Sequence, residues 1–136
     1  MAAVADQYEE FKKLGVEVLG ISTDSVYAHK VFAETSPSAK KVQYPLASDR
    51  NQQISRAYGV LDVEKGAAYR ATFFIDPEGI VTTKLIYPRE VGRNIYEHIR
   101  IIQGLQYGRE TGLGIPANWV PGMPGLVRDF RFVGRI

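Results

Sequence analysis

Two β-prone segments around a four-residue turn constrain the fold more than any other feature of the sequence. Residues 71–75 (ATFFI) and 80–87 (IVTTKLIY) are rich in aromatic and β-branched side chains, which favour strands. Between them lies DPEG, residues 76–79. Proline at the second position and glycine at the fourth suit a type I turn. The pattern therefore predicts an antiparallel hairpin.

The chain before this hairpin alternates between helical and strand patterns. Val4, Tyr8 and Phe11 recur at helical spacing, so the first residues should form a helix that ends near Gly15. No N-capping residue precedes this helix, so the sequence contains no signal for its start. Residues 16–22 (VEVLGIS) are β-branched and almost uncharged, which is typical of a buried parallel strand.

The same alternation continues up to the hairpin. A second helix is expected over residues 26–35, because Ser25 is a good N-cap residue. Residues 44–47 favour a short strand. Asp49 and Gln52 have the spacing of a capping box, which predicts that a brief helix comes after them.

A last helix is expected after the hairpin. Asn94 and Glu97 form a second capping box at its start. Isoleucines 95, 99 and 102 would lie on its buried face, and Gly104 should lie near its end. After Gln106 the helical pattern gives way to a tail rich in glycine and proline.

This order of elements predicts an α/β domain in which the hairpin adds an antiparallel edge. The chain has 136 residues, of which 45% are apolar and 24% charged. These values are typical of one globular domain. We divide the chain into a core, residues 1–107, and an extended C-terminal tail, residues 108–136.

The composition excludes several functions. The chain has no cysteine, which excludes thiol catalysis, disulfides and thiolate metal sites, and we predict no metal and no cofactor. No apolar run is long enough to span a membrane. The N-terminus lacks the features of a secretory signal, so a cytoplasmic location is the default. The net charge is only +2, and the interleaved charges do not predict nucleic-acid binding.

The remaining polar residues suggest no alternative enzyme. His29 and His98 are single and far apart in the sequence, which favours surface or core histidines over ligands. The run from Ser22 to Ser25 could hold a loop nucleophile. However, no G-x-S-x-G elbow surrounds it, and helix capping already explains these residues.

Four longer segments resemble the peroxiredoxin family, the alkyl hydroperoxide reductase and thiol-specific antioxidant group. Their order and spacing agree with the family from the first residues to about Pro121, and PANWVPG (116–122) is similar to the family's tail. The segments are VEVLGISTDSVYAHKVFAE (16–34), YPLASDRNQQISRAYGVLD (44–62), GAAYRATFFIDPEG (66–79) and YPREVGRNIYEHIRIIQGLQY (87–107).

The resemblance implies a thioredoxin-like (peroxiredoxin) fold and thiol-dependent peroxide reduction. In the family, the reactive cysteine lies in a Pro-Thr-Cys type loop just upstream of a helix like the first one here. We therefore expect Met1 to match an internal position, with the N-terminal strands and the cysteine loop lacking. Arg70 in AYRATFFI and Arg93 in VGRN match the family's supporting arginines, which lower a cysteine pKa and polarise the peroxide.

Two alternatives stay open at these positions. An arginine on a strand or at a helix start is more often a surface ion-pair partner than a site residue. Ile115 stands near the place where two-cysteine members carry their resolving cysteine. Descent from a one-cysteine subgroup and drift after loss of activity explain it equally well.

The resemblance also implies a gap in the sheet, between the strands expected at 16–21 and 71–75. Unpaired backbone groups are costly, so we expect another polypeptide or strand exchange to fill the gap, or the sheet to rearrange. The family's association habits imply a homo-oligomer, with dimers through the edge at residues 80–87 and rings of dimers beyond. The tail, residues 108–136, would then contact a partner subunit.

Two functions are consistent with these features. In the first, the cysteine-free chain is inactive and survives as an oligomerising, structural remnant of a peroxiredoxin. In the second, it is the C-terminal half of an active thiol peroxidase. The cysteine-bearing N-terminal part would then come from the full-length gene product or from a separate fragment.

Overall fold

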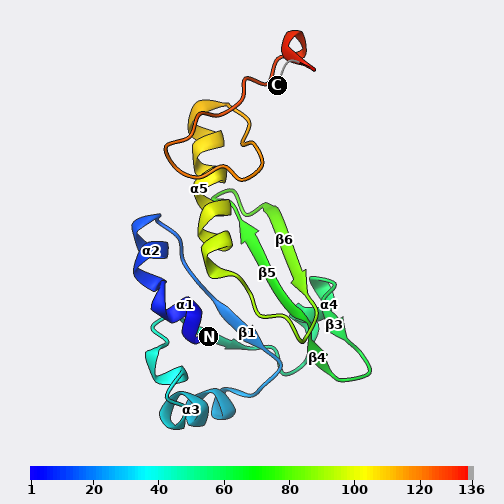
Figure 1. Cartoon of the computed structure of the whole chain (residues 1–136). Coiled ribbons are helices and arrows are strands. Elements are labelled where there is room, and N and C mark those ends of the chain that lie inside the picture. The colour runs from blue at the N-terminus through cyan, green and yellow to red at the C-terminus, as the bar shows by residue number, and fades with distance from the viewer. Residues whose placement is uncertain (135–136) are drawn as a thin grey trace. The chain divides into compact units, whose positions relative to one another are not determined.

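The computed structural model of the chain describes residues 1–134 and divides into two compact units, Met1–Arg93 and Asn94–Ile136 (Figure 1). The first unit contains the strands and several short helices, and the second contains one long helix and the tail. Among the described residues, no helix is long and apolar enough to cross a membrane.

The N-terminal region forms two short helices, α1 (Ala2–Asp6) and α2 (Tyr8–Lys13), where the sequence predicted one. They are separated at Gln7. Its N–H donates to the Val4 carbonyl, three residues back, at 3.1 Å, which tightens the turn as in a 3₁₀-helix. Phe11 is buried on α2, as its helical spacing predicted.

A short parallel pair comes next, β1 (Gly20–Ser22) and β2 (Leu46–Ser48). The strand predicted over residues 16–22 is therefore wrong for its first four residues. The ladder begins where the Gly20 N–H donates to the carbonyl of Pro45 at 2.9 Å. Because proline has no N–H to donate, β2 pairs only from the next residue onward.

The helix predicted over residues 26–35 is confirmed as α3 (Val26–Thr35), and it is followed by the 3₁₀-helix η1 (Ala39–Lys41). The Ser25 hydroxyl caps α3 by accepting from the Ala28 N–H at 3.1 Å. This signal is local in the sequence, which is why the sequence could predict it.

The capping box predicted at Asp49 and Gln52 is wrong, although a helix does form after them, α4 (Gln53–Ala57). Gln52 has a left-handed backbone with φ 61° and makes no side-chain cap. The buried Asp49 carboxylate instead accepts from the N–H groups of Ile54 at 2.9 Å and Ser55 at 2.7 Å. The left-handed backbone of Gln52 turns the chain, so that the Asp49 carboxylate reaches N–H groups beyond the predicted capping position.

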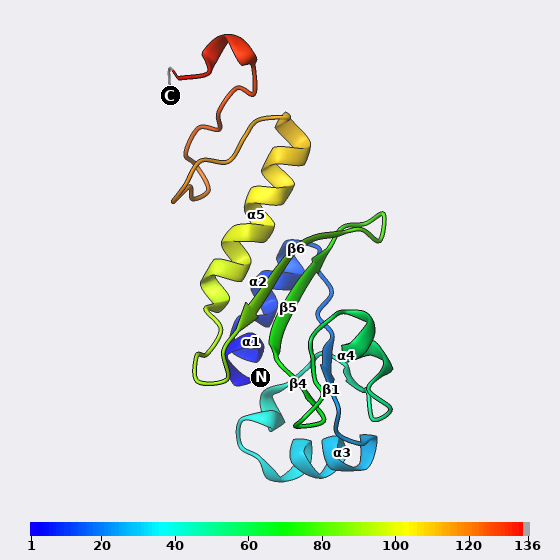
Figure 2. The same ribbon diagram turned by 90° about the vertical axis from the view of Figure 1, so that its right-hand side faces the viewer.

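The predicted hairpin is confirmed by β5 (Arg70–Ile75) and β6 (Val81–Tyr87), which run side by side as one antiparallel ribbon (Figure 2). A smaller antiparallel pair, β3 (Leu61–Asp62) and β4 (Ala67–Ala68), precedes it. The sequence missed this pair because two-residue strands are too short to show any periodicity.

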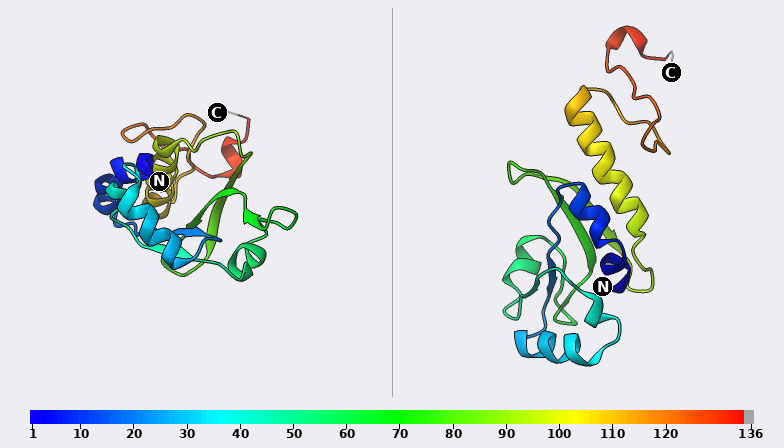
Figure 3. Two further views of the ribbon diagram at one scale, coloured as in Figure 1. Left: turned by 90° about the horizontal axis from the view of Figure 1, so that it is seen from below. Right: turned by 90° about the vertical axis from the view of Figure 1, so that its left-hand side faces the viewer.

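Each described strand pairs with one neighbour only, and no ladder joins β1 to β5 within residues 1–134. The Phe74 carbonyl accepts from the Thr82 hydroxyl on β6, whereas the Ala71 carbonyl accepts from the Arg93 side chain. Backbone groups of a strand alternate between its edges, so Arg93 lies on the edge of β5 away from β6. Within this unit, α1 and α2 lie on one side of β5, and α4 with β3 and β4 on the other (Figure 3).

The second unit begins with α5 (Ile95–Thr111), capped by Asn94 as the sequence predicted. The expectation that this helix ends near Gly104 is wrong, since it continues to a left-handed cap at Gly112 with φ 73°. Gly104 instead leaves room for the tail, because a Cβ atom there would lie 3.4 Å from Ile115.

The tail after α5 folds back on that helix for part of its length. Gly114 and Leu126 exchange backbone hydrogen bonds of 2.7 and 2.8 Å, and Trp119 between them is only 2% exposed. The chain then reaches the 3₁₀-helix η2 (Phe130–Phe132), where the Phe130 side chain is 91% exposed. The tail therefore consists of a packed part up to Leu126 and an exposed apolar part after it.

Candidate active-site arginine pair

Arg70 is the first residue of β5, where it pairs with Tyr87 at the end of β6. Its Nε donates to the carbonyl of Arg89 at 2.7 Å. This bond ties the loop after β6 to the start of β5, so the guanidinium is held at the open end of the hairpin. The side chain is exposed on its other side.

Arg93 lies at the end of the same loop, and its side chain contacts the same strand, β5. Its Nη2 donates to the Ala71 carbonyl at 2.9 Å, one residue along from Arg70. Its Nε is buried and has no hydrogen-bond partner among the described residues. The structure therefore brings together the two arginines that the resemblance singled out, through one strand and the loop after the hairpin.

In this arginine pair, Arg70 and Arg93, two positive charges lie close together. Burial lowers the pKa of Arg93, and the nearby positive charge of Arg70 lowers it further. No ion pair joins either arginine to a carboxylate within residues 1–134. Buried charges are normally paired or hydrogen-bonded, so this arrangement suits a small or covalently attached anion.

The start of the chain lies at this arginine pair. The pKa of the Met1 amino group is lowered by burial, then by the charge of Arg93 and that of Arg70. The Tyr44 hydroxyl donates to the Met1 carbonyl at 3.2 Å, and Tyr44 is 6% exposed. Burial raises the pKa of Tyr44, while the charge of Arg93 acts in the opposite direction. Four separate segments thus meet at one place.

Sequence reasoning missed Tyr44 and the position of Met1. Tyr44 is an aromatic residue ahead of a short strand, a pattern that indicates core packing; it does pack against Tyr8, with ring centroids 5.8 Å apart. Only the tertiary structure brings positions 1, 44, 70 and 93 together. No local signal could have found this arrangement.

The other singled-out residues lie elsewhere. His29 Nε2 is 2.7 Å from the Ser22 hydroxyl, which itself donates to Asp24 at 2.7 Å. Since that serine proton is directed at Asp24, the serine is not activated as a nucleophile. His98 is buried on α5, in the other unit. Among the described residues, no group of three or more His, Cys, Asp or Glu side chains could hold a metal ion.

The arginine pair can stabilise negative charge, but it cannot break an O–O bond. Its groups are cations and a phenol, and the chain contains no cysteine to supply a thiolate. Guanidinium groups beside a thiol lower its pKa and favour the nucleophilic thiolate. The groups that meet here therefore supply positive charge and one phenol, and no thiolate.

Comparison with known proteins identifies the class to which this fold belongs. The structure matches the crystal structure of Enterococcus faecalis AhpC with a TM-score of 0.81 and 35% sequence identity, covering 85% of this chain and 69% of that one. It matches the reduced 2-Cys peroxiredoxin of Plasmodium vivax with a TM-score of 0.85 and 34% identity, covering 91% of this chain and 65% of the other. The fold is the thioredoxin-like α/β fold of the peroxiredoxins.

The sequence comparisons agree. Residues 1–84 match the AhpC/TSA family. Peroxiredoxin 2 of Thermoplasma acidophilum is 40% identical over 126 residues, which cover 91% of this chain and 63% of that protein. Alkyl hydroperoxide reductase C of Pseudomonas aeruginosa is 40% identical over 133 residues, covering 97% of this chain and 71% of that protein. The chain belongs to the AhpC/TSA family.

Proposed function

We propose that this cysteine-free chain does not reduce peroxides by itself and that its arginine pair is the supporting half of a thiol peroxidase site. Peroxide reduction in this way needs a thiolate that attacks the peroxide oxygen and becomes a sulfenic acid. No other side chain at the pair can take that role, since its groups are guanidinium cations and a tyrosine. The cysteine-bearing part would come from a longer gene product or a separate fragment.

The observation that supports this proposal is the position of Met1 beside Arg93 and Arg70. Residues that precede Met1 in a longer chain would start from this point. The family resemblance places the cysteine loop just upstream of this helix, so its thiol would come within reach of both guanidinium groups. The open edge of β5 that carries Arg93 would then receive the additional strand.

The exposed apolar surface of this chain favours a second function, in which the chain is a structural remnant of a peroxiredoxin that forms oligomers. On the hairpin edge, Val81 is 45% and Ile86 49% exposed, which supports dimers through residues 80–87. The tail carries Val127 at 57% and Phe130 at 91% exposure, which supports contact with a partner subunit, as proposed for residues 108–136. Rings of dimers and a cytoplasmic location belong to the same proposal.

The test compares this chain with a version extended at its N-terminus by the cysteine-bearing portion of the Thermoplasma acidophilum relative. The matched control is the extended version with cysteine replaced by serine. Peroxide consumption is measured with dithiothreitol as reductant. We expect activity only in the extended, cysteine-containing protein, and a large loss when it also carries Arg93→Gln.

Native mass measurement of the unextended chain separates the two functions further. Oligomers without activity, and no gain of activity on extension, would favour the structural remnant. Peroxide consumption by the unextended chain above the serine control would contradict both functions.

A further inference from the structure

The ring of Tyr44 is fixed from two sides. Tyr44 lies between η1 and β2, and its side chain is buried. The ring packs against Tyr8 of α2, with the two rings tilted at 52° to each other. A Cβ atom added at Gly20 of β1 would lie 3.4 Å from the same ring, so the ring also lies against the backbone of that strand. The position of the Tyr44 hydroxyl is therefore set by a helix and a strand.

This hydroxyl bonds the residue at which α1 begins. It donates to the Met1 carbonyl, which also accepts from the N–H groups of Val4 at 3.1 Å and Ala5 at 3.0 Å. Burial raises the pKa of Tyr44 more than the charge of Arg93 lowers it. The phenol consequently keeps its proton at neutral pH and remains a hydrogen-bond donor to the start of the helix.

The start of α1 needs an anchor outside the helix. The helix has five residues and no side-chain cap at Met1, and so short a helix is not stable by itself. Lys41 pairs with Asp6 of α1 at 3.2 Å, but both side chains are exposed, and such pairs contribute little. The hydroxyl of Tyr44 is on a buried side chain, where a lost hydrogen bond is costly.

The bond of Tyr44 to Met1 lies in the field of the arginine pair. The charges of Arg93 and Arg70 act on the Met1 amino group, and the charge of Arg93 acts on the Tyr44 hydroxyl as well. A change in the position of Met1 would therefore change its distance from the arginine pair.

We propose that Tyr44 is a positioning residue whose hydroxyl holds the start of α1 beside the arginine pair through the Met1 carbonyl. The consequence for catalysis rests on the thiol peroxidase function proposed above. Residues that precede Met1 in a longer chain would leave from a point that Tyr44 fixes. A cysteine among them would be a stronger acid with the hydroxyl than without it, because nearby guanidinium groups favour the thiolate.

A purely structural role for Tyr44 makes a different prediction. If the side chain only fills space, Tyr44→Phe keeps the ring and leaves Met1 where it is. If its hydrogen bond only adds stability, Tyr44→Phe lowers the melting temperature without changing the electrostatic surroundings of Met1. The experiments must therefore measure position and stability separately.

The first experiment uses the unextended chain and involves no peroxide. The pKa of the Met1 amino group is measured by NMR titration in the unchanged chain and in Tyr44→Phe, and thermal unfolding checks that each protein is folded. This pKa is lowered in the unchanged chain by burial and by both arginines. We expect it to move toward its ordinary value of 8.0 in Tyr44→Phe.

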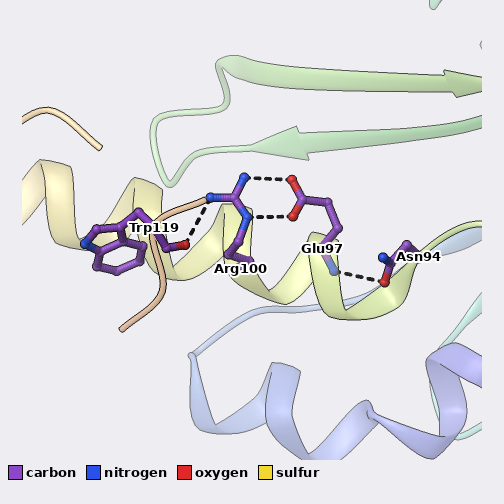
Figure 4. A network of polar contacts seen from close by, with 4 residues as sticks. All are labelled: Asn94, Glu97, Arg100 and Trp119. Carbon is purple, nitrogen blue, oxygen red and sulfur yellow. Dashed lines mark hydrogen bonds and ion pairs between the residues drawn. The ribbon is translucent and has the colours of Figure 1, made fainter. Parts of the chain in front are cut away.

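Arg100→Gln is the matched control, because it removes side-chain hydrogen bonds in the other unit (Figure 4). Arg100 donates to the Glu97 carboxylate at 2.6 and 2.7 Å and to the Trp119 carbonyl at 3.3 Å. The loss of these bonds should lower the melting temperature. It should leave the pKa of the Met1 amino group unchanged.

The second experiment uses the N-terminally extended, cysteine-containing protein and measures its reaction with hydrogen peroxide as a function of pH. We expect Tyr44→Phe to raise the thiol pKa. At a pH below that pKa, the rate should fall about threefold or more, because the thiolate fraction falls with it. At high pH, where the thiol is ionised in both proteins, the rates should agree within about twofold.

Three results would overturn the proposal: an unchanged Met1 pKa in Tyr44→Phe, the same shift in Arg100→Gln, or an unchanged pH profile in an active extended protein. An extended protein without activity would contradict the thiol peroxidase function, whereas a shifted Met1 pKa in Tyr44→Phe would still support the positioning role. If Tyr44→Phe does not fold, Tyr44→Met replaces it, because a flexible apolar side chain fills much of the same space without a hydroxyl.

Discussion

Replacing Trp119 by alanine should destabilise the chain by about 3–5 kcal/mol, the usual cost of removing a buried Trp. The structure supports this magnitude, since the side chain is 2% exposed. Burying an aromatic ring removes about 200 Å² from water, worth about 5 kcal/mol at about 25 cal/mol per Å². The variant also leaves the Met123 carbonyl without its 2.8 Å indole donor. Trp119→Phe keeps a ring in place and should cost less, about 1–3 kcal/mol.

Urea unfolding followed by far-UV circular dichroism measures this effect. With a slope of about 2 kcal/mol per M, a loss of about 4 kcal/mol lowers the midpoint by about 2 M. Tyr96→Ala is the matched control on the same helix, because Tyr96 is 71% exposed and should change stability by less than about 0.5 kcal/mol. A change of less than about 1 kcal/mol in Trp119→Ala would refute the packing of the tail on α5.

Three further predictions concern polar and charged side chains. Burial alone would raise the pKa of Asp49, but hydrogen bonds from Ser55 and Ile54 outweigh it and lower this pKa. The ionised Asp49 carboxylate therefore stabilises the fold above the ordinary aspartate pKa, and this stabilisation is lost as pH falls through the pKa of the folded state. Thermal unfolding at several pH values should show that acidification lowers the melting temperature less in Asp49→Asn than in the unchanged chain. Sulfate at ten times its dissociation constant should stabilise the chain by about 1.4 kcal/mol through the arginine pair, and an equal gain in Arg93→Gln would contradict that. Asn94→Ala should cost about 1 kcal/mol by removing the α5 cap, measured by urea unfolding; no change would mean that the cap adds nothing.

The elements with local signals could be predicted from the sequence. The hairpin was predictable from strand propensity on both sides of a turn, and α3 from the Ser25 cap. Gly104 does not lie near the end of its helix, because it leaves room for Ile115, which follows the end of α5 and folds back on it. The capping box at Gln52 does not form, because the turn into α4 has a left-handed backbone at this position, which a spacing rule does not describe.

The candidate site was predictable only in part. Arg70 and Arg93 were found through the resemblance, since charge and spacing alone favoured surface ion pairs for both. That Tyr44 and Met1 join them depends on the packing of four segments, and no pattern within any one segment encodes it. That Arg93 forms no ion pair within residues 1–134 likewise depends on the tertiary structure, because Glu90 is close to it in the sequence.

The most direct test of the central claim is the pKa of the Met1 amino group, measured by NMR titration of the intact chain. We expect a value below the ordinary 8.0, and a value closer to 8.0 in Arg93→Gln and Arg70→Gln, with Arg50→Gln as the unchanged control. An amino group that titrates at its ordinary pKa, and that does not respond to either substitution, would contradict the position of Met1 beside the arginine pair.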